Sequence, residues 1–303
     1  MDGCIRRNGG WIGLWLCLLS VPGFAGPVEV VKADLSTLIQ AAAPTPTQFA
    51  VLVPHKGSLQ STGSWTVHGD LATWRYTVRI PTAISMSFHA DKVLLPSSAR
   101  LTVRGSSSYT YGARDVHKGA LWSRITPGDV LDFTLTVAST DRASVRFDIF
   151  SLQAGYRSLG GGVQDHPLYR KLKAQAASSS TSTCVQNYQC SAIAANTAPA
   201  AATVGLVIGN LYQCTGTLIN DVPGDNTPFV LTARHCESGR AGGGNPGAAS
   251  TVVVYWDAVT ACGQPLGTLY DTGIVTQAGA STIVEQQDAW LIQLDTSPAV
   301  TDA

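Results

Sequence analysis

Residues 228–236 of the chain are Pro-Phe-Val-Leu-Thr-Ala-Arg-His-Cys, an apolar run typical of a β-strand that ends in a polar turn. The turn carries His235 next to Cys236. A second such run, Cys-Thr-Gly-Thr-Leu-Ile-Asn at residues 214–220, begins with Cys214. A third, Asp-Ala-Trp-Leu-Ile-Gln-Leu at residues 288–294, begins with Asp288, where a buried carboxylate could reach the histidine. The three runs predict short strands whose ends present a histidine, two cysteines and a carboxylate.

The segment around these runs has the pattern of a small β-barrel. Turn signals separate its apolar runs, and helical periodicity is almost absent. Gly209 and Asn210 are residue types that suit a tight hairpin turn between two of the runs. We therefore predict a six-stranded barrel within residues 184–303. Its expected strands include residues 203–208, 211–220, 229–233, 251–256 and 289–294.

Residues 26–170 show strand periodicity throughout. Apolar and polar residues alternate along several runs, for example at residues 131–137 and 145–149. Pro127-Gly-Asp129 supplies one of the turns between runs. Strands with one apolar and one polar face, joined by short turns, are typical of an antiparallel β-sandwich. The whole chain is therefore predicted to be all-β, with a sandwich followed by a barrel.

A polar link separates these two parts. Gly160-Gly-Gly162 is followed by the Ser- and Thr-rich residues 174–183, which cannot bury apolar area. We place the linker at residues 171–183, because the composition changes across it and the second part of the chain begins with Cys184.

Residues 1–25 have the pattern of a secretory signal peptide. Arg6 and Arg7 precede an apolar run over residues 11–21, and the small residues Gly23 and Ala25 favour cleavage after Ala25. The run is shorter than the roughly 20 residues that a membrane span needs. A buried N-terminal helix is the alternative. We expect a secreted, soluble product that does not associate with membranes.

Charge excludes some partners. The formal net charge is zero and only 13% of the 303 residues are charged, so there is no electrostatic basis for binding nucleic acid or an anionic membrane.

Five cysteines remain once the signal peptide is removed. All lie in the last 120 residues, and in an oxidising compartment such cysteines form disulfides. Metal binding is the alternative, but the spacing does not provide the paired ligands of a zinc site, so we expect neither a metal nor a cofactor. Because five is odd, either one thiol is free or its partner lies outside this sequence. The five are Cys184, Cys190, Cys214, Cys236 and Cys262.

The motif Thr-Ala-Arg-His-Cys resembles the histidine box of the trypsin-like serine endopeptidases. The blocks at residues 214–220, 252–256 and 288–294 resemble the bacterial lysyl endopeptidase branch of that family. This resemblance, which covers roughly residues 184–303, implies the first of two β-barrels with an active site between them. It also implies that residues 26–170 form a pro-region, removed on maturation. The expected partner is a protein or peptide substrate, and the expected product is a monomer.

The resemblance assigns roles to individual residues. His235 would be the general base and Asp288 the carboxylate that orients it, with Asp295 and Asp271 as poorer candidates because they lack the family's context. It pairs Cys214 with Cys236, and Cys190 with Cys262. Cys184 resembles a cysteine that reaches into the second barrel, so its partner would be missing from this sequence.

The catalytic serine has no candidate. The family's nucleophile lies in a Gly-x-Ser-Gly segment, C-terminal to the aspartate, and the 303 residues contain none. The sequence ends shortly after the Asp288 block, as a fragment of a longer precursor would. We therefore expect these residues by themselves to have no peptidase activity.

A binding protein is the rival interpretation. In it the barrel is a catalytically inactive scaffold, and Trp65, Trp74 and Trp122 of the sandwich form an exposed platform for carbohydrate, although core positions are the more common role for such aromatics. Five histidines are scattered singly through residues 26–170, and we expect structural roles for them. They are His55, His68, His89, His117 and His166.

Overall fold

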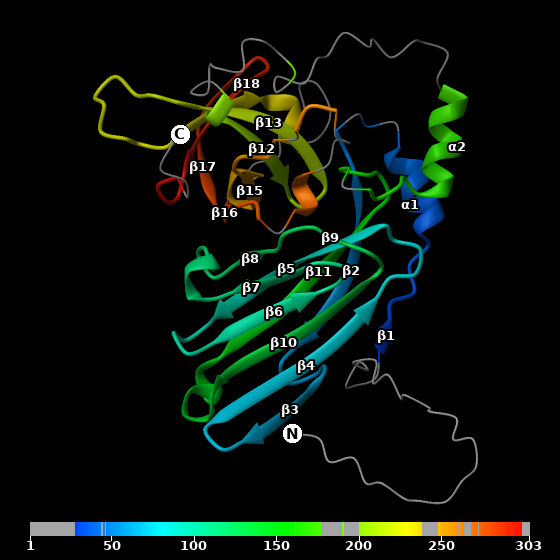
Figure 1. Cartoon of the computed structure of the whole chain (residues 1–303), viewed down its shortest axis with the longest axis vertical. Helices are drawn as coiled ribbons and strands as arrows, with labels where there is room; N and C mark the ends of the chain where they lie inside the picture. The colour runs from blue at the N-terminus through cyan, green and yellow to red at the C-terminus, as the bar shows by residue number, and fades with distance from the viewer. Residues whose placement is uncertain are drawn as a thin grey trace, which may run out of the picture.

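The computed structural model places a β-sandwich beside a β-barrel, with two short α-helices at their junction (Figure 1). It describes residues 28–43, 45, 47–160, 162–176, 190, 200–237, 248–259, 261–263, 268–271 and 273–298. The prediction of an all-β fold is confirmed. The proposed signal peptide at residues 1–25 and Cys184 lie outside the described residues.

One sheet of the sandwich has the strand order β1-β4-β10-β6-β7, and β3 pairs with the outer part of β4. Its pairings are antiparallel except that of β1 with β4, which is parallel. The strands are β1 (Val28–Val30), β3 (Ser64–His68), β4 (Leu71–Arg79), β6 (Arg100–Arg104), β7 (Ser108–Tyr111) and β10 (Val130–Ala138).

The second sheet has the order β2-β11-β5-β8, and β9 also pairs with β5. All of its pairings are antiparallel, as the alternating sequence pattern predicts. The strands are β2 (Ala50–Ser58), β5 (Ser85–Leu94), β8 (Leu121–Trp122), β9 (Thr126–Pro127) and β11 (Arg146–Gly155).

A cluster of aromatic rings fills the space between the two sheets. Phe133 on β10 lies at its centre, with ring centroids 5.1 Å from Phe88 and 5.9 Å from Tyr76. Trp74 and Phe147 complete the cluster at 6.4 and 6.3 Å from Phe133. These residues come from both sheets, and all but Tyr76 are at most 1% exposed. They therefore join the sheets into one hydrophobic core.

Two α-helices correct the prediction of strands throughout residues 26–170. Helix α1 (Leu35–Ala42) begins at Asp34, whose carboxylate accepts the Thr37 backbone N–H at 3.1 Å, and it buries Leu35, Ile39 and Ala42. Helix α2 (Pro167–Ala176) packs Leu168, Tyr169 and Leu172 against the sandwich core. Residues 171–176 of the predicted linker are therefore helical. No helix in the described part of the chain could cross a membrane.

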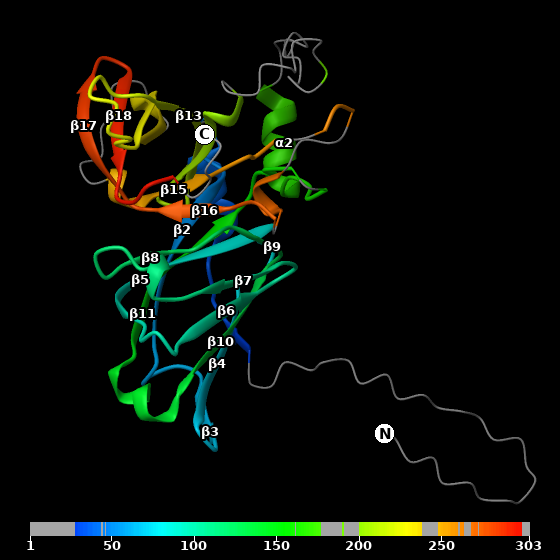
Figure 2. The same ribbon diagram turned by 60° about the vertical axis from the view of Figure 1, so that its left-hand side comes forward.

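The barrel is one sheet with the order β16-β15-β12-β13-β14-β18-β17 (Figure 2). Only Gly279 separates β16 from β17, so the two ends of the sheet are halves of a single bent strand. Counted this way, six strands close the barrel. The strands are β12 (Thr203–Ile208), β13 (Tyr212–Ile219), β14 (Phe229–Ala233), β15 (Val252–Tyr255), β16 (Thr276–Ala278), β17 (Ala280–Gln286) and β18 (Ala289–Leu294).

Glycine is required at the bend that closes the barrel. Gly279 has φ +92°, a region that side chains disfavour, and a Cβ there would lie 2.7 Å from the Asp295 carboxylate. The turn at Gly209 and Asn210 has positive φ at both residues, +59° and +54°, as the tightest hairpin turns require. The predicted hairpin between β12 and β13 is present.

Candidate active site

His235 lies where β14 ends. The strand is followed directly by the short 3₁₀ helix η4 (Arg234–Glu237), which turns the chain and carries His235. Val230 and Thr232 point into the barrel and are buried, so the strand that precedes the histidine is held by the core. The polar turn predicted after this apolar run is therefore a helical turn at the rim of the barrel.

Asp288 occupies the two-residue turn between β17 and β18. Because Ala233 pairs with Ala289, the end of β14 lies next to the start of β18. The Arg234 N–H donates to the backbone carbonyl of Asp288 at 2.8 Å, which extends this pairing into the turn. Strand register thus brings Asp288 next to His235, although the two are 53 residues apart in sequence.

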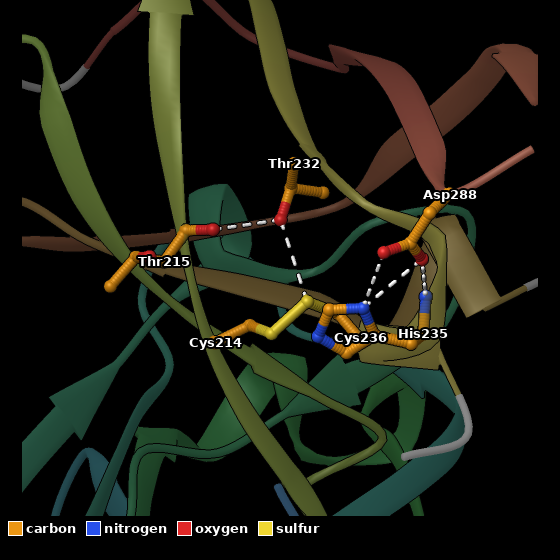
Figure 3. Close-up of a disulfide and its surroundings, with 6 residues drawn as sticks. All are labelled: Cys214, Thr215, Thr232, His235, Cys236 and Asp288. Carbon is orange, nitrogen blue, oxygen red and sulfur yellow. Dashed lines mark hydrogen bonds and ion pairs between the residues drawn. A yellow bond between two sulfur atoms is a disulfide. The ribbon is translucent and has the colours of Figure 1, made fainter. Parts of the chain in front are cut away.

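The Asp288 carboxylate binds both the ring and the backbone of His235 (Figure 3). Its two oxygens lie 3.0 and 2.9 Å from Nδ1, and one of them also accepts the His235 backbone N–H at 3.0 Å. These hydrogen bonds, first that of the imidazole, lower the pKa of Asp288. An ionised carboxylate at Nδ1 favours the tautomer that has its proton there, which leaves Nε2 free to accept a proton.

The exposure of the pair differs from the expectation of a buried carboxylate. The Asp288 side chain is 60% exposed and that of His235 is 39% exposed. Asp288 lies at the tip of a two-strand hairpin, where nothing in the described part of the chain covers it. The aspartate therefore reaches the histidine from the surface of the barrel.

A disulfide fixes the turn that carries His235. Cys236 is bonded to Cys214 on β13, and it is 1% exposed. The Thr232 hydroxyl donates to the Thr215 carbonyl at 2.7 Å and lies 3.6 Å from the Cys236 sulfur, which ties the same turn to the same strand. The chain is thus held on both sides of His235, by β14 before it and by the disulfide at Cys236 after it.

A second disulfide joins Cys190 to Cys262. The two bonds are the pairs that the resemblance implied. The structure also brings Cys214, His235 and Cys236 within 4.8 Å of one another. That cluster is not a metal site, because its two sulfurs are bonded to each other and provide no thiolate.

The other candidate carboxylates have different partners. Asp295 forms an ion pair with Lys118 at 3.2 Å, and Asp271 accepts the Gly273 N–H at 2.8 Å. Neither contacts His235 in the structure, so Asp288 is the carboxylate that the fold brings to the imidazole.

Arg234 and Glu285 are neighbours of the site that the sequence did not identify as a pair. The Arg234 Nε lies 3.5 Å from a Glu285 carboxylate oxygen, and both side chains are less than one-third exposed. The ion pair links η4 to β17 close to the turn that holds Asp288. The only signal in the sequence is that Glu285 precedes Asp288 by three residues in the same hairpin, which becomes informative once the pairing of strands is known.

The tryptophans of the sandwich do not form a common platform. Trp74 is fully buried in the sandwich core. Trp65 packs under the guanidinium of Arg142, and Trp122 stacks on His89 in a different cluster. The observation that suggested carbohydrate binding therefore has no counterpart in the structure.

Four of the five sandwich histidines have structural contacts there. His55 bonds the Tyr76 hydroxyl at 2.8 Å, His89 lies 3.0 Å from the Asp91 carboxylate, and His166 accepts the Leu168 N–H at 3.2 Å. His117 forms an isolated bridge with Ala120. These contacts agree with structural roles.

Comparison with known families gives a match that covers the barrel. Residues 178–302 match the family model described as "Lysyl endopeptidase, C-terminal domain". This part of the chain is therefore similar to a protease domain of the lysyl endopeptidase kind, and it contains His235, Asp288 and both disulfides.

Proposed function

We propose that this chain is the precursor of a secreted trypsin-like serine endopeptidase and that it carries the histidine and the aspartate of the catalytic triad. The observation that supports this most strongly is the Asp288 carboxylate on Nδ1 of His235, at 2.9 and 3.0 Å, within the part that is similar to lysyl endopeptidase. The chain order, histidine before aspartate, agrees with the trypsin-like arrangement. Two disulfides agree with an oxidising, extracellular compartment.

The pair has the parts that a general base needs. With Nδ1 held by the carboxylate, Nε2 takes the proton from a serine hydroxyl as that hydroxyl attacks the peptide carbonyl. Asp288 stabilises the imidazolium that forms, and it remains ionised because its pKa is lowered. The second hydrogen bond, from the His235 backbone N–H, fixes the carboxylate in position before the reaction.

The nucleophile is not supplied by these 303 residues, since they contain no Gly-x-Ser-Gly segment. In this proposal the serine, the backbone amides of the oxyanion hole and the specificity pocket belong to a second barrel. The chain by itself provides the base and its carboxylate, so we expect it to have no endopeptidase activity.

Fusion to a second barrel tests the proposal. The chain through residue 298 is joined to the second barrel of a lysyl endopeptidase, and hydrolysis of peptide substrates is measured. We expect activity that His235→Ala abolishes. Asp288→Asn should lower kcat by about 10⁴-fold, because an amide favours the wrong imidazole tautomer. Asp295→Asn, which changes a carboxylate bound to Lys118, is the matched control and should retain activity.

Two results would contradict the proposal. One is an active fusion whose rate is unchanged by Asp288→Asn. The other is His235-dependent hydrolysis of a peptide ester by the chain alone. If the fusion does not fold, NMR of the unfused chain gives the answer. The Nδ1 proton of His235 should be strongly deshielded, and Asp288→Asn should move it upfield while Asp295→Asn leaves it in place.

A further inference from the structure

The sandwich and the barrel share a hydrophobic cluster. On the barrel side the cluster contains outward-facing residues of β12 and β15, which lie on the opposite side of the wall from the barrel's own core. The outside of a small barrel normally faces water, so an apolar outer wall indicates a surface that another part of the molecule covers. The shared cluster is made of Phe49, Ala50, Ile125 and Leu159 from the sandwich with Val207, Val253, Tyr255, Tyr270 and Ile274 from the barrel.

A buried arginine lies at the centre of this contact. Arg124 of the sandwich is 8% exposed, and its guanidinium donates to two backbone carbonyls of the barrel, those of Ile274 and, at 2.5 Å, Asp271. The guanidinium lies over the ring of Tyr109 from its own module at 4.3 Å, and 5.6 Å from the ring of Tyr255 of the barrel. Arginine remains charged at any physiological pH, so its burial depends on these barrel groups.

Polar groups on both sides add specific hydrogen bonds. The Asn210 amide, from the hairpin turn between β12 and β13, donates to the Ser123 carbonyl at 3.1 Å and is fully buried. The Tyr109 hydroxyl donates to the Tyr270 carbonyl at 3.0 Å. The turn that shapes the barrel hairpin therefore also recognises the sandwich.

Backbone pairing extends the contact beyond side chains. The Phe49 N–H donates to the Leu211 carbonyl, and the Gln213 N–H donates to the Thr47 carbonyl, each at 2.9 Å. The segment that leads into β2 thus lies alongside the same barrel hairpin. Hydrogen bonds of this kind fix the register of two surfaces as well as their contact.

The docked sandwich leaves the His235–Asp288 pair uncovered. Lys118 of the sandwich contacts Asp295, which follows the end of β18, whereas Asp288 precedes its start. Six strand residues separate the two ends, a distance of about 20 Å at 3.3 Å per residue. The hairpin of β17 and β18 points away from the sandwich (Figure 2).

From these contacts we infer that the outer wall of the barrel is a docking surface for the sandwich, and that the sandwich remains bound to it, with Arg124 as its anchor, after the chain between them is cut. The sandwich acts as a lasting structural partner of the barrel and does not block the catalytic pair. The association is non-covalent, because residues 26–183 contain no cysteine. This inference rests on the contact between the two parts and not on peptidase activity.

A controlled cut tests the inference. A recognition sequence for a site-specific protease replaces residues 177–183, and the folded full chain is cut and passed over a size-exclusion column at about 1 μM, with native mass spectrometry of the peak. We expect the two pieces to elute together as a 1:1 complex. Separate elution of two folded pieces would overturn the inference.

Substitutions identify the anchor. Arg124→Met keeps much of the side-chain volume but removes the hydrogen bonds, and we expect it to raise the dissociation constant of the cut complex at least tenfold. Arg142→Met, an exposed arginine of the sandwich that stacks on Trp65, is the control and should behave like the unsubstituted chain. An unchanged dissociation constant for Arg124→Met would refute the anchor.

A milder change covers the case in which Arg124→Met does not fold. Tyr109→Phe removes only the hydroxyl that donates to Tyr270, and a smaller increase in the dissociation constant is expected from it. Circular dichroism of the uncut variants checks their folding. Since neither residue contacts His235 or Asp288 in the structure, the outcome is independent of the catalytic proposal.

Discussion

The sandwich and the barrel reach stability by different means. The sandwich relies on a large aromatic core between two sheets, and residues 26–183 contain no cysteine. The barrel has a smaller core, to which two disulfides and the apolar contact with the sandwich are added. A small module buries less apolar surface per residue than a large one and therefore depends more on covalent links and neighbours. The need to position His235 is a further reason for a disulfide at the adjacent Cys236.

The largest expected effect is the destabilisation of the sandwich, but not of the barrel, by a change in the sandwich core. Phe133→Ala removes the ring at the centre of the aromatic cluster and should lower the free energy of unfolding of the sandwich by about 3–5 kcal/mol. Hydrogen exchange followed by mass spectrometry measures each module separately. Peptides from β4, β10 and β11 should lose protection more than peptides from β14 and β18. Equal loss in both modules would show that they unfold as one unit.

The barrel should respond most to loss of its central disulfide. Replacing Cys214 and Cys236 together by serine opens a loop of 22 residues and should cost about 3 kcal/mol in the chain-entropy model. Urea unfolding, with the same exchange experiment to assign the change, should place the loss in the barrel. Destabilisation confined to the sandwich would contradict the comparison.

Closure of the barrel is tested at its bend. Gly279→Ala forces a side chain into φ +92° and towards the Asp295 carboxylate, and it should cost about 2 kcal/mol. Gly69→Ala in the sandwich has a positive φ of +57° but open space around the new Cβ. The difference between the two in urea unfolding therefore measures the steric contact with Asp295 together with the greater backbone strain at φ +92°. A smaller cost at Gly279 than at Gly69 would show that the bend tolerates a side chain.

The smallest expected effect is a loss of sandwich stability at mildly acidic pH. Burial lowers the pKa of His55 below its ordinary 6.5, against a smaller opposing effect of Glu29, and burial also lowers the pKa of His89. The unfolded chain then binds protons more readily, so sandwich stability falls as the pH drops below about 6.5 towards the folded pKa values. In the barrel, Asp288 has a lowered pKa, so its contribution to stability is lost only when the pH falls below about 3.8, the ordinary pKa of this carboxyl.

Urea unfolding at pH 7.5 and pH 5.5 measures this difference. The sandwich should lose stability between the two pH values, and His55→Gln should reduce that loss. An unchanged pH dependence in His55→Gln would assign the effect to the other buried histidines.

Much of the site could be predicted because its signals are local. The run before His235, the hairpin turn at Gly209 and Asn210, and the apolar strand after Asp288 each depend on neighbouring residues, and the structure has each of them at the predicted place. Helix α1 was missed for the opposite reason. Its eight residues are too few to form a stable helix alone, and it exists because Leu35 and Ile39 are buried against the sandwich.

Alternation of apolar and polar residues and turn glycines were sufficient to predict the strands and the all-β class, because backbone geometry imposes these patterns over a few residues. The candidate residues of the site came from the resemblance of the motif around His235, and of the block at Asp288, to a known family. Three features depended on contacts between distant segments. They are the exposure of Asp288, the bend at Gly279 that closes the barrel, and the burial of Arg124 between the sandwich and the barrel. The exposure of a side chain and the closure of a barrel are set by which surfaces meet when the chain folds. The order of apolar and polar residues along the sequence does not say which surfaces those are.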